Sequence, residues 1–210
     1  MHLSWLNKSI KDRYVYIPGF EGRFYGKLPK NNWQKHIPIP NGPINYLEIG
    51  VLDGANVILI SKSYAKHPDS RIYCVDPWMD YDEYPEYKHE QEVGYNRFLS
   101  NVTRLTDTNK FVIKRGLSDD IVPTFENNFF DIIFVDGNHE TDYVYRDGIM
   151  ALQKIKVGGY IVFDDYWLNT NVWPQTKVGI DRFIAEFKDK LDIIYNGEST
   201  FGQIIVRRKL

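Results

Sequence analysis

The sequence has 210 residues, of which 43% are hydrophobic, and its formal net charge is −2. This length suits one α/β domain with a short extension, and the hydrophobic content is enough for a sizeable core. The slight acidity and the lack of a basic stripe argue against a nucleic-acid partner. The single cysteine, Cys74, excludes an internal disulfide and a cysteine-based zinc cluster.

One cysteine also fits a reducing compartment. No apolar run approaches the roughly 18 residues of a membrane span, and the first residues lack the apolar stretch of a signal peptide. We therefore expect a soluble, cytoplasmic protein with no membrane partner. The expected partner is a small-molecule or glycan substrate, and a homodimer is an open alternative.

Residues 1–43 differ from the rest of the chain. They are rich in aromatic residues, Lys, Pro and Gly, and they show no sustained period. We predict an irregular N-terminal arm, with room for one short helix, that packs over the domain or covers a site. Pro38, Pro40 and Pro43 mark its boundary with a second unit, residues 44–210.

From residue 44 onward, short apolar runs alternate with segments of helical spacing. The predicted strands are 44–49, 71–75, 110–114, 130–135, 159–163, 192–195 and 202–206. The predicted helices are 56–66, 88–105, 118–126, 142–155 and 178–188. This alternation predicts an α/β fold of the Rossmann-like kind, with a mainly parallel seven-stranded sheet and helices on both faces.

Ligands of such sheets bind beyond the carboxyl ends of the strands. Glu48, Gly50 and Gly54 follow or end the first strand, and the next helix begins near Asn56. The glycines permit a tight turn, and a helix N-terminus can receive a carboxylate. Asp76 follows the second strand, where a carboxylate suits the two hydroxyls of a ribose. Nicotinamide dehydrogenases share these features, but the spacing here is E-x-G-x-x-x-G rather than G-x-G-x-x-G.

Three carboxylates follow two further strands. Asp136 ends the fourth strand, and Asp164 and Asp165 end the fifth. If the two strands are neighbours, the carboxylates meet at one edge and repel one another unless they are protonated or neutralised. A divalent cation such as Mg²⁺ or Mn²⁺ would neutralise them, although Asp164 and Asp165 could instead cap the next helix. His139 is a candidate general base, the alternative being a structural histidine.

Two segments carry a family resemblance. YLEIGVLDGANV (46–57) resembles motif I of class I S-adenosylmethionine-dependent methyltransferases, and IYCVDPW (72–78) resembles their second-strand motif. The resemblance implies that Glu48, Gly50, Gly54 and Asn56 line the methionine part of the cofactor and that Asp76 holds its ribose. Residues 115–123 are similar to the adenine-contacting segment of catechol O-methyltransferases, which would place Leu117 and Ser118 near the adenine ring.

The second half of the chain resembles a narrower group. V-D-G-x-H followed by G-G-x-I-x-x-D-D is similar to metal-dependent O-methyltransferases, including sugar O-methyltransferases of macrolide and aminocoumarin pathways and glycan-decorating relatives in large DNA viruses. His139 replaces the lysine base of the catechol enzymes, and Asp165 replaces their asparagine ligand; both departures fit the sugar group. The resemblance implies a metal on Asp136, Asp164 and Asp165, with His139 and Asp136 catalytic.

The expected reaction is therefore methyl transfer from S-adenosylmethionine to a sugar hydroxyl, with a deoxyhexose such as rhamnose as one acceptor. Three alternatives stay open: a small phenolic acceptor, a NAD-dependent oxidoreductase, and a cofactor-binding protein without catalysis. We predict that the acceptor wall is formed by the N-terminal arm and by the aromatic loop that contains Trp78, Tyr81, Tyr84 and Tyr87.

Overall fold

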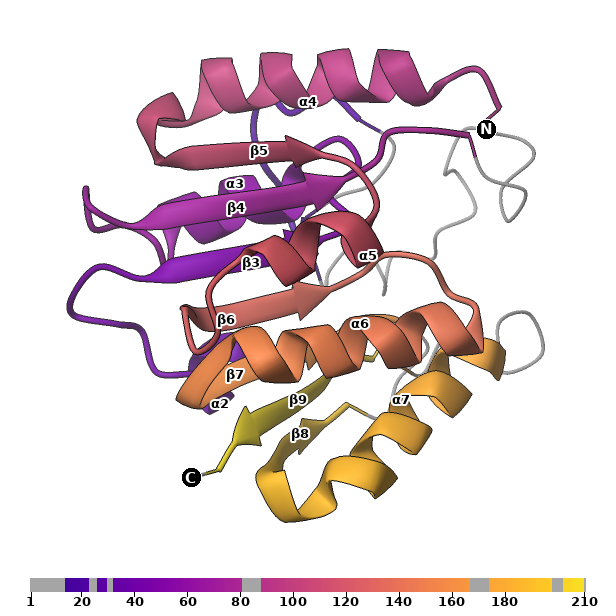
Figure 1. Ribbon diagram of the computed structural model, residues 1–210. Helices are drawn as coiled ribbons and strands as arrows, with labels where there is room; N and C mark the ends of the chain where they lie inside the picture. The colour runs from indigo at the N-terminus through magenta and orange to yellow at the C-terminus, as the bar shows by residue number, and fades with distance from the viewer. Residues whose placement is uncertain are drawn as a thin grey trace.

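The computed structural model describes residues 14–22, 26–29, 32–80, 88–166, 174–197 and 202–209. Its central feature is a seven-stranded sheet (Figure 1). In chain order, the strands are β3 (Asn45–Ile49), β4 (Arg71–Asp76), β5 (Phe111–Arg115), β6 (Phe130–Val135), β7 (Ile155–Phe163), β8 (Leu191–Asn196) and β9 (Ile204–Arg208).

The strand order in the sheet is β5-β4-β3-β6-β7-β9-β8. β9 alone runs antiparallel to its neighbours, β7 and β8, while β3 to β7 pair in parallel. The prediction of a mainly parallel seven-stranded sheet is confirmed. Because β3 lies between β4 and β6, the loops after these three strands meet at one edge, where a ligand is expected.

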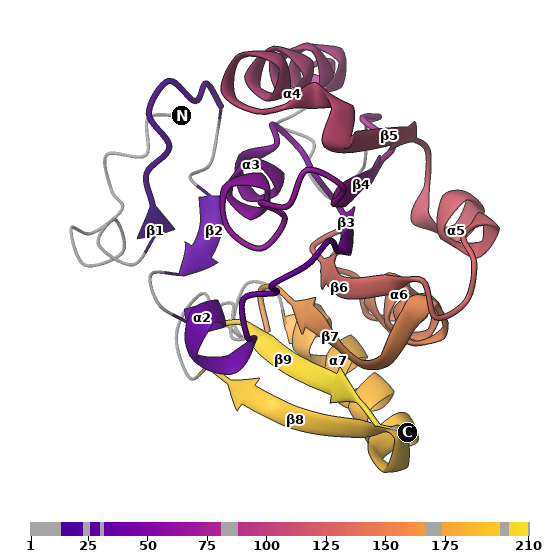
Figure 2. The same ribbon diagram turned by 90° about the vertical axis from the view of Figure 1, so that its left-hand side faces the viewer.

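Helices cover both faces of the sheet (Figure 2). One face carries α2 (Asn32–His36), α3 (Ala55–Lys62) and α4 (Gln91–Leu105); the other carries α5 (Ser118–Ile121), α6 (Thr141–Lys154) and α7 (Pro174–Phe187). Successive side chains of a strand point to opposite faces. Accordingly, Tyr46 belongs to the first core and Leu47 to the second, and both are fully buried.

The N-terminal arm contains more regular structure than its sequence predicts. The short helix is present as α2, and β1 (Tyr14–Val15) pairs antiparallel with β2 (Gly26–Pro29) in a separate two-stranded sheet. This pairing joins segments that are separated in sequence, so local periodicity does not reveal it. Trp33 of α2 is completely buried, which ties the arm to the body of the domain.

Two predicted helices change at their ends for local reasons. The segment predicted at 118–126 is α5 followed by a 3₁₀ turn at Val122–Thr124, since Pro123 cannot donate a helical hydrogen bond. The last helix begins at Pro174 rather than near residue 178, and proline is well suited to a first helical turn. Among the helices of the described ranges, none has the length and apolarity needed to cross a membrane.

The closest approach at the ligand edge involves Gly50, which follows β3 with φ of 83°. A Cβ atom on Gly50 would lie 2.0 Å from the carbonyl oxygen of Asp136 and 2.5 Å from its carbonyl carbon. Both contacts are with backbone that cannot rotate away. Glycine is therefore required here to let the loops after β3 and β6 pack together.

We expect Gly50→Ala to lower the free energy of unfolding by about 2–4 kcal/mol, because the strain of a positive φ and overpacking each cost roughly 1–3 kcal/mol. Urea unfolding monitored by tryptophan fluorescence measures the change. Gly42→Ala is the matched control, since no heavy atom lies within 4 Å of its Cβ position, and its effect should stay within about 0.5 kcal/mol. Equal effects of the two substitutions would contradict the close approach.

Candidate active site

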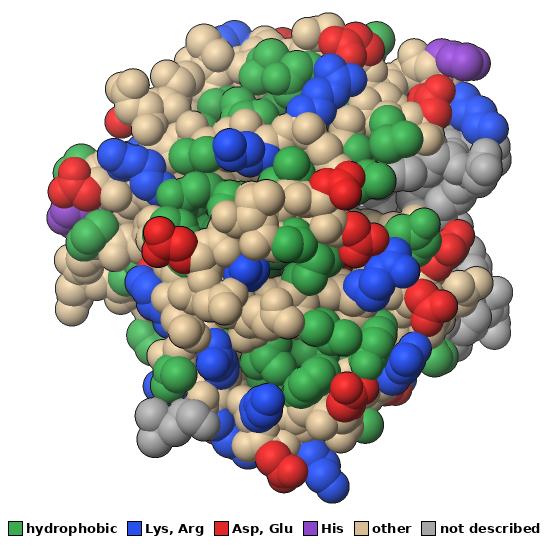
Figure 3. Space-filling view, in the orientation of Figure 1, with side chains coloured by type: hydrophobic (Ala, Val, Ile, Leu, Met, Phe, Trp, Pro, Cys, Tyr) green, Lys and Arg blue, Asp and Glu red, His purple; other side chains and the backbone are tan. Residues whose placement is uncertain are grey.

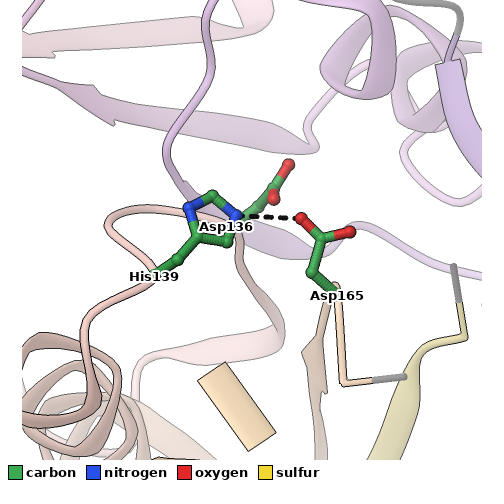
Figure 4. Close-up of side chains that lie close together, drawn as sticks. All are labelled: Asp136, His139 and Asp165. Atoms are coloured by element: carbon green, nitrogen blue, oxygen red, sulfur yellow. Dashed lines mark hydrogen bonds and ion pairs between the residues drawn. The ribbon is translucent and has the colours of Figure 1, made fainter. Parts of the chain in front are cut away.

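Three side chains converge at the carboxyl edge of the sheet: Asp136, His139 and Asp165 (Figure 4). Each offers one potential ligand atom, and these atoms all lie within 4.8 Å of one another. His139 Nε2 lies 2.9 Å from Asp165 Oδ2. Two carboxylates and an imidazole at this spacing are a donor set that can hold a divalent cation or move a proton.

Backbone hydrogen bonds that continue the sheet hold this cluster in place. The amide of Asp136 donates to the Ile49 carbonyl at 2.8 Å, and the amide of Asp164 donates to the Val135 carbonyl at 3.1 Å. Asp165 then turns out of the strand direction with φ of 55°. The sequence prediction that β6 and β7 bring these acidic residues to one edge is confirmed by the pairing of the two strands.

A contact from α7 supports the loop that carries His139. Thr176 is buried, and its hydroxyl donates to the His139 carbonyl at 3.2 Å. The loop is also bounded by a small cavity of about 10 Å³ that Asp136, His139, Asp164 and Thr176 help to line. Thr176 was not among the predicted site residues, because nothing in its local sequence indicates a contact made 37 positions away.

Asp164, the third predicted metal ligand, lies beside the cluster but outside the group of three found among the described residues. Its side chain is buried, and its Oδ1 accepts a hydrogen bond of 3.2 Å from Gln203 Nε2. Gln203 is itself buried and was not predicted. The signal available in the sequence is a lone amide ahead of the apolar run of β9, because a buried amide needs polar partners.

Three buried polar side chains, those of Tyr46, Glu48 and Asn56, are hydrogen-bonded to one another beside the glycine turn at the start of α3. Glu48 Oε2 accepts from the Tyr46 hydroxyl at 2.5 Å and from Asn56 Nδ2 at 2.8 Å. Asn56 Oδ1 is buried without a hydrogen-bond partner in the structure. A buried acceptor of this kind is costly unless a ligand donates to it. This orphaned oxygen fits the ammonium group of S-adenosylmethionine.

The helix terminus beside it also fits that cofactor. α3 begins after Gly54, which has φ of 87° and makes no side-chain cap hydrogen bond. The first amides of a helix have no partner within the helix, so an uncapped terminus attracts a carboxylate. The predicted residues Glu48, Gly50, Gly54 and Asn56 therefore lie together around one turn.

Asp76 lies where predicted, at the end of β4, but its carboxylate is engaged by the protein. Oδ2 accepts from the amides of Val51 and Leu52 at 2.8 and 2.9 Å, and Oδ1 accepts from the amide of Trp78 at 2.7 Å. Burial raises the pKa of Asp76, and these three amides oppose the shift. Three of about four acceptor positions are thus in use, which leaves about one for a ribose hydroxyl.

Ser118 is the first residue of α5, and Leu117 is its N-cap. Both follow Gly116, whose amide donates to the Asp76 carbonyl at 3.1 Å. Leu117 is 42% exposed. Ser118 hydrogen-bonds to the buried carboxyl of Asp147, on α6. The same carboxyl packs against Gly137, whose Cβ position lies 3.2 Å from Asp147 Oδ2. Asp147 thus links the predicted adenine segment to the loop that carries Asp136 and His139.

The prediction of an aromatic acceptor wall is wrong for Trp78. Its side chain is 1% exposed, its Nε1 donates to the Leu52 carbonyl at 2.9 Å, and its ring stacks on Phe98 at 5.0 Å. Because the ring is enclosed by the protein, no face is open to an acceptor. Residues 81, 84 and 87 of the same predicted wall lie outside the described part of the chain.

The strand order, the glycine turn after β3 and the acidic residue Asp76 at the end of β4 together form the architecture of a class I methyltransferase. Comparison with protein families matches residues 47–166, more than half of the chain, to the family described as "Methyltransferase domain". The chain belongs to this family. The resemblance to S-adenosylmethionine-dependent methyltransferases seen in the sequence is confirmed.

Known proteins resemble this chain in sequence or in fold. An uncharacterized protein of Acanthamoeba polyphaga mimivirus is 28% identical over 149 residues; the match covers 69% of this chain and 61% of that protein. The O-methyltransferase TomG of Streptomyces achromogenes, solved with SAM, has a TM-score of 0.60 at 19% identity over 79% of this chain and 73% of its own. A Bacillus cereus O-methyltransferase solved with SAH has a TM-score of 0.59 at 20% identity, over 79% and 74%. These likenesses establish the shared fold.

The buried carboxyl of Asp147 predicts a pH dependence of stability. Burial raises its pKa to about 7, with the Ser118 hydrogen bond and Arg146 opposing the shift and Asp119 adding to it. An unfolded aspartate titrates near pH 4, so folding takes up a proton between about pH 4 and 7. The contribution of Asp147 to stability is present below that window and is lost as the pH rises through it.

Asp147→Asn removes this titration and keeps the side-chain shape. The stability of the wild type relative to this variant should fall by up to about 1.4 kcal/mol per pH unit between pH 5 and 7. Urea unfolding of both proteins at pH 5, 6 and 7 measures the difference. A relative stability that rises with pH over this range would contradict the assignment.

Proposed function

We propose that this protein transfers a methyl group from S-adenosylmethionine to a hydroxyl oxygen, assisted by a divalent cation at the acidic cluster and by His139 as the base. The observation that carries the proposal is the convergence of Asp136, His139 and Asp165 within 4.8 Å, beside a cofactor turn with an orphaned buried acceptor on Asn56. Membership in the methyltransferase family favours methyl transfer over the nicotinamide alternative.

The residues divide between the two reactants. Asn56 Oδ1 and the amino end of α3 would hold the amino-acid end of the cofactor, Leu117 and Ser118 its adenine, and Asp76 its ribose. Asp136 and Asp165, with Asp164 adjacent, would hold the cation. When bound, S-adenosylmethionine supplies a methyl group on a sulfonium sulfur, and a divalent cation supplies positive charge that lowers the pKa of a hydroxyl.

His139 supplies the proton acceptor. The hydroxyl proton of the acceptor would pass to Nδ1 of His139, the ring nitrogen that Asp165 does not engage (Figure 4). The Asp165 carboxylate, 2.9 Å from Nε2, can only accept a hydrogen bond, so it would hold the imidazole in the tautomer with the proton on Nε2 and the lone pair on Nδ1. Thr176 holds the backbone of His139 from the other side. Fixing both reactants in line contributes much of the rate.

We propose a sugar hydroxyl as the acceptor, with a deoxyhexose such as rhamnose in a glycan as the specific case. The support is the pair of departures from the catechol enzymes, His139 in place of lysine and Asp165 in place of asparagine. Acidic and basic side chains are interspersed on the face of the molecule shown in Figure 3.

For the cofactor, we expect calorimetry to show S-adenosylhomocysteine binding and no NAD binding. Asn56→Ala should weaken S-adenosylhomocysteine binding roughly tenfold to a hundredfold, because hydrogen bonds to charged groups contribute about 1.5–3 kcal/mol. The thermal melt of the variant checks that it is folded. Binding of NAD in place of S-adenosylhomocysteine would overturn the cofactor assignment.

For the reaction, transfer of labelled methyl to free sugars and oligosaccharides should stop with chelator and return with Mg²⁺ or Mn²⁺. His139→Ala should lower kcat by roughly 10²–10⁴, the range for a positioned general base, whereas His67→Ala, remote from the cluster, should not. Asp136→Asn and Asp165→Asn should weaken cation binding more than cofactor binding. Activity that survives chelation while His139→Ala abolishes it would remove the cation from the mechanism, and transfer to catechol alone would replace the sugar.

A further inference from the structure

A chain of buried hydrogen bonds connects the N-terminal arm to Asp164, which lies beside the cluster of Asp136, His139 and Asp165. Trp33 Nε1 of α2 donates to Gln203 Oε1 at 2.7 Å, and Gln203 Nε2 donates to Asp164 Oδ1 at 3.2 Å. The exposed fractions of Trp33, Gln203 and Asp164 are 0%, 2% and 5%. The chain joins residues 170 positions apart in the sequence.

The sheet dictates the first part of this arrangement. β7 and β9 are antiparallel with Phe163 opposite Ile204, so Asp164 and Gln203 are the next facing pair. Val162 and Ile205 belong to the core under α2 and α3. Side chains two positions apart share a face, which directs both Asp164 and Gln203 toward the arm. Figure 2 shows α2 lying beside the start of β9 on this face.

The indole of Trp33 decides which way the Gln203 amide points. An indole nitrogen can only donate, so it selects the carbonyl oxygen of the amide. The Gln203 NH₂ group is then the one that faces Asp164, and a carboxylate can only accept. The ring of Trp33 also packs on Phe134 at 5.6 Å between centroids, two residues before Asp136. Trp33 therefore supports both strands that carry the acidic residues.

We propose that Gln203, oriented by Trp33, is a positioning residue that holds the Asp164 carboxylate beside Asp165, which makes the N-terminal arm part of the catalytic apparatus. The inference rests on the proposed function only in that the acidic cluster binds a cation. Groups that orient metal-binding carboxylates typically change metal affinity by 10–100-fold when removed.

The first test compares three variants by Mn²⁺ titration, with free Mn²⁺ measured by electron paramagnetic resonance. Gln203→Met keeps the length of the side chain and removes its amide, and Trp33→Phe keeps an aromatic ring and removes the donor. Both should weaken Mn²⁺ binding roughly tenfold or more. The matched control is Tyr64→Phe, which removes another buried bond from the body to the arm, from the Tyr64 hydroxyl to the Ile37 carbonyl at 3.0 Å.

Tyr64→Phe should leave the Mn²⁺ affinity within twofold of the wild type, because Ile37 has no part in the chain that ends at Asp164. S-adenosylhomocysteine affinity should also stay within twofold in Gln203→Met and Trp33→Phe, which shows that the fold and the cofactor turn persist. Equal losses of Mn²⁺ affinity in all three variants would mean that the arm only stabilises the fold in general, and this result would overturn the inference.

A second test needs no cation. Thermal melts of Trp33→Phe, Asp164→Asn and their double variant form a cycle, and the shifts in melting temperature should be non-additive because both residues act through Gln203. In a control cycle, Tyr64→Phe takes the place of Trp33→Phe, and its shift in melting temperature should add to that of Asp164→Asn. If the wild type binds no Mn²⁺, the cation part of the proposed function fails while this cycle still decides the inference: additivity of Trp33→Phe with Asp164→Asn overturns it.

Discussion

The arrangement of the site depends on backbone hydrogen bonds that continue the parallel sheet one residue past the strands. The amide of Gly50 donates to the Val75 carbonyl, that of Gly116 to Asp76, that of Asp136 to Ile49, and that of Asp164 to Val135. Each bond fixes the first residue of a loop at the carboxyl edge. The loops therefore begin from set positions, which brings the side chains that follow toward one another.

The close packing of the loops after β3 and β6 requires a glycine at position 50. Where the loops after β3 and β6 meet, the Asp136 carbonyl occupies the space that any side chain on residue 50 would need. The same packing brings the cofactor turn next to the acidic cluster. The proposed methyl transfer would require donor and acceptor to lie in line, and two loops in backbone contact would favour that proximity.

The site is also held from outside the sheet, on both faces. On one face, Asp147 of α6 pairs with Ser118, and Thr176 of α7 bonds to the loop of His139. On the other face, Trp33 reaches Asp164 through Gln203. Such buried polar contacts are costly unless every member is paired, so they specify one arrangement of the loops. Through Trp33 of α2, the arm thus contacts a residue next to the site.

The sequence alone determined the alternation of strands and helices, the glycine turn, and the acidic residues that end β4, β6 and β7, because these depend on local periodicity and on residue type. Only the tertiary structure decided which carboxylates meet. Asp165 turns toward His139, while Asp164 faces Gln203, a residue brought opposite it by antiparallel pairing. The tertiary structure also decided that Trp78 is enclosed and that Trp33 is linked to Asp164 by hydrogen bonds through Gln203. Contacts between distant segments produce no periodic pattern in the sequence.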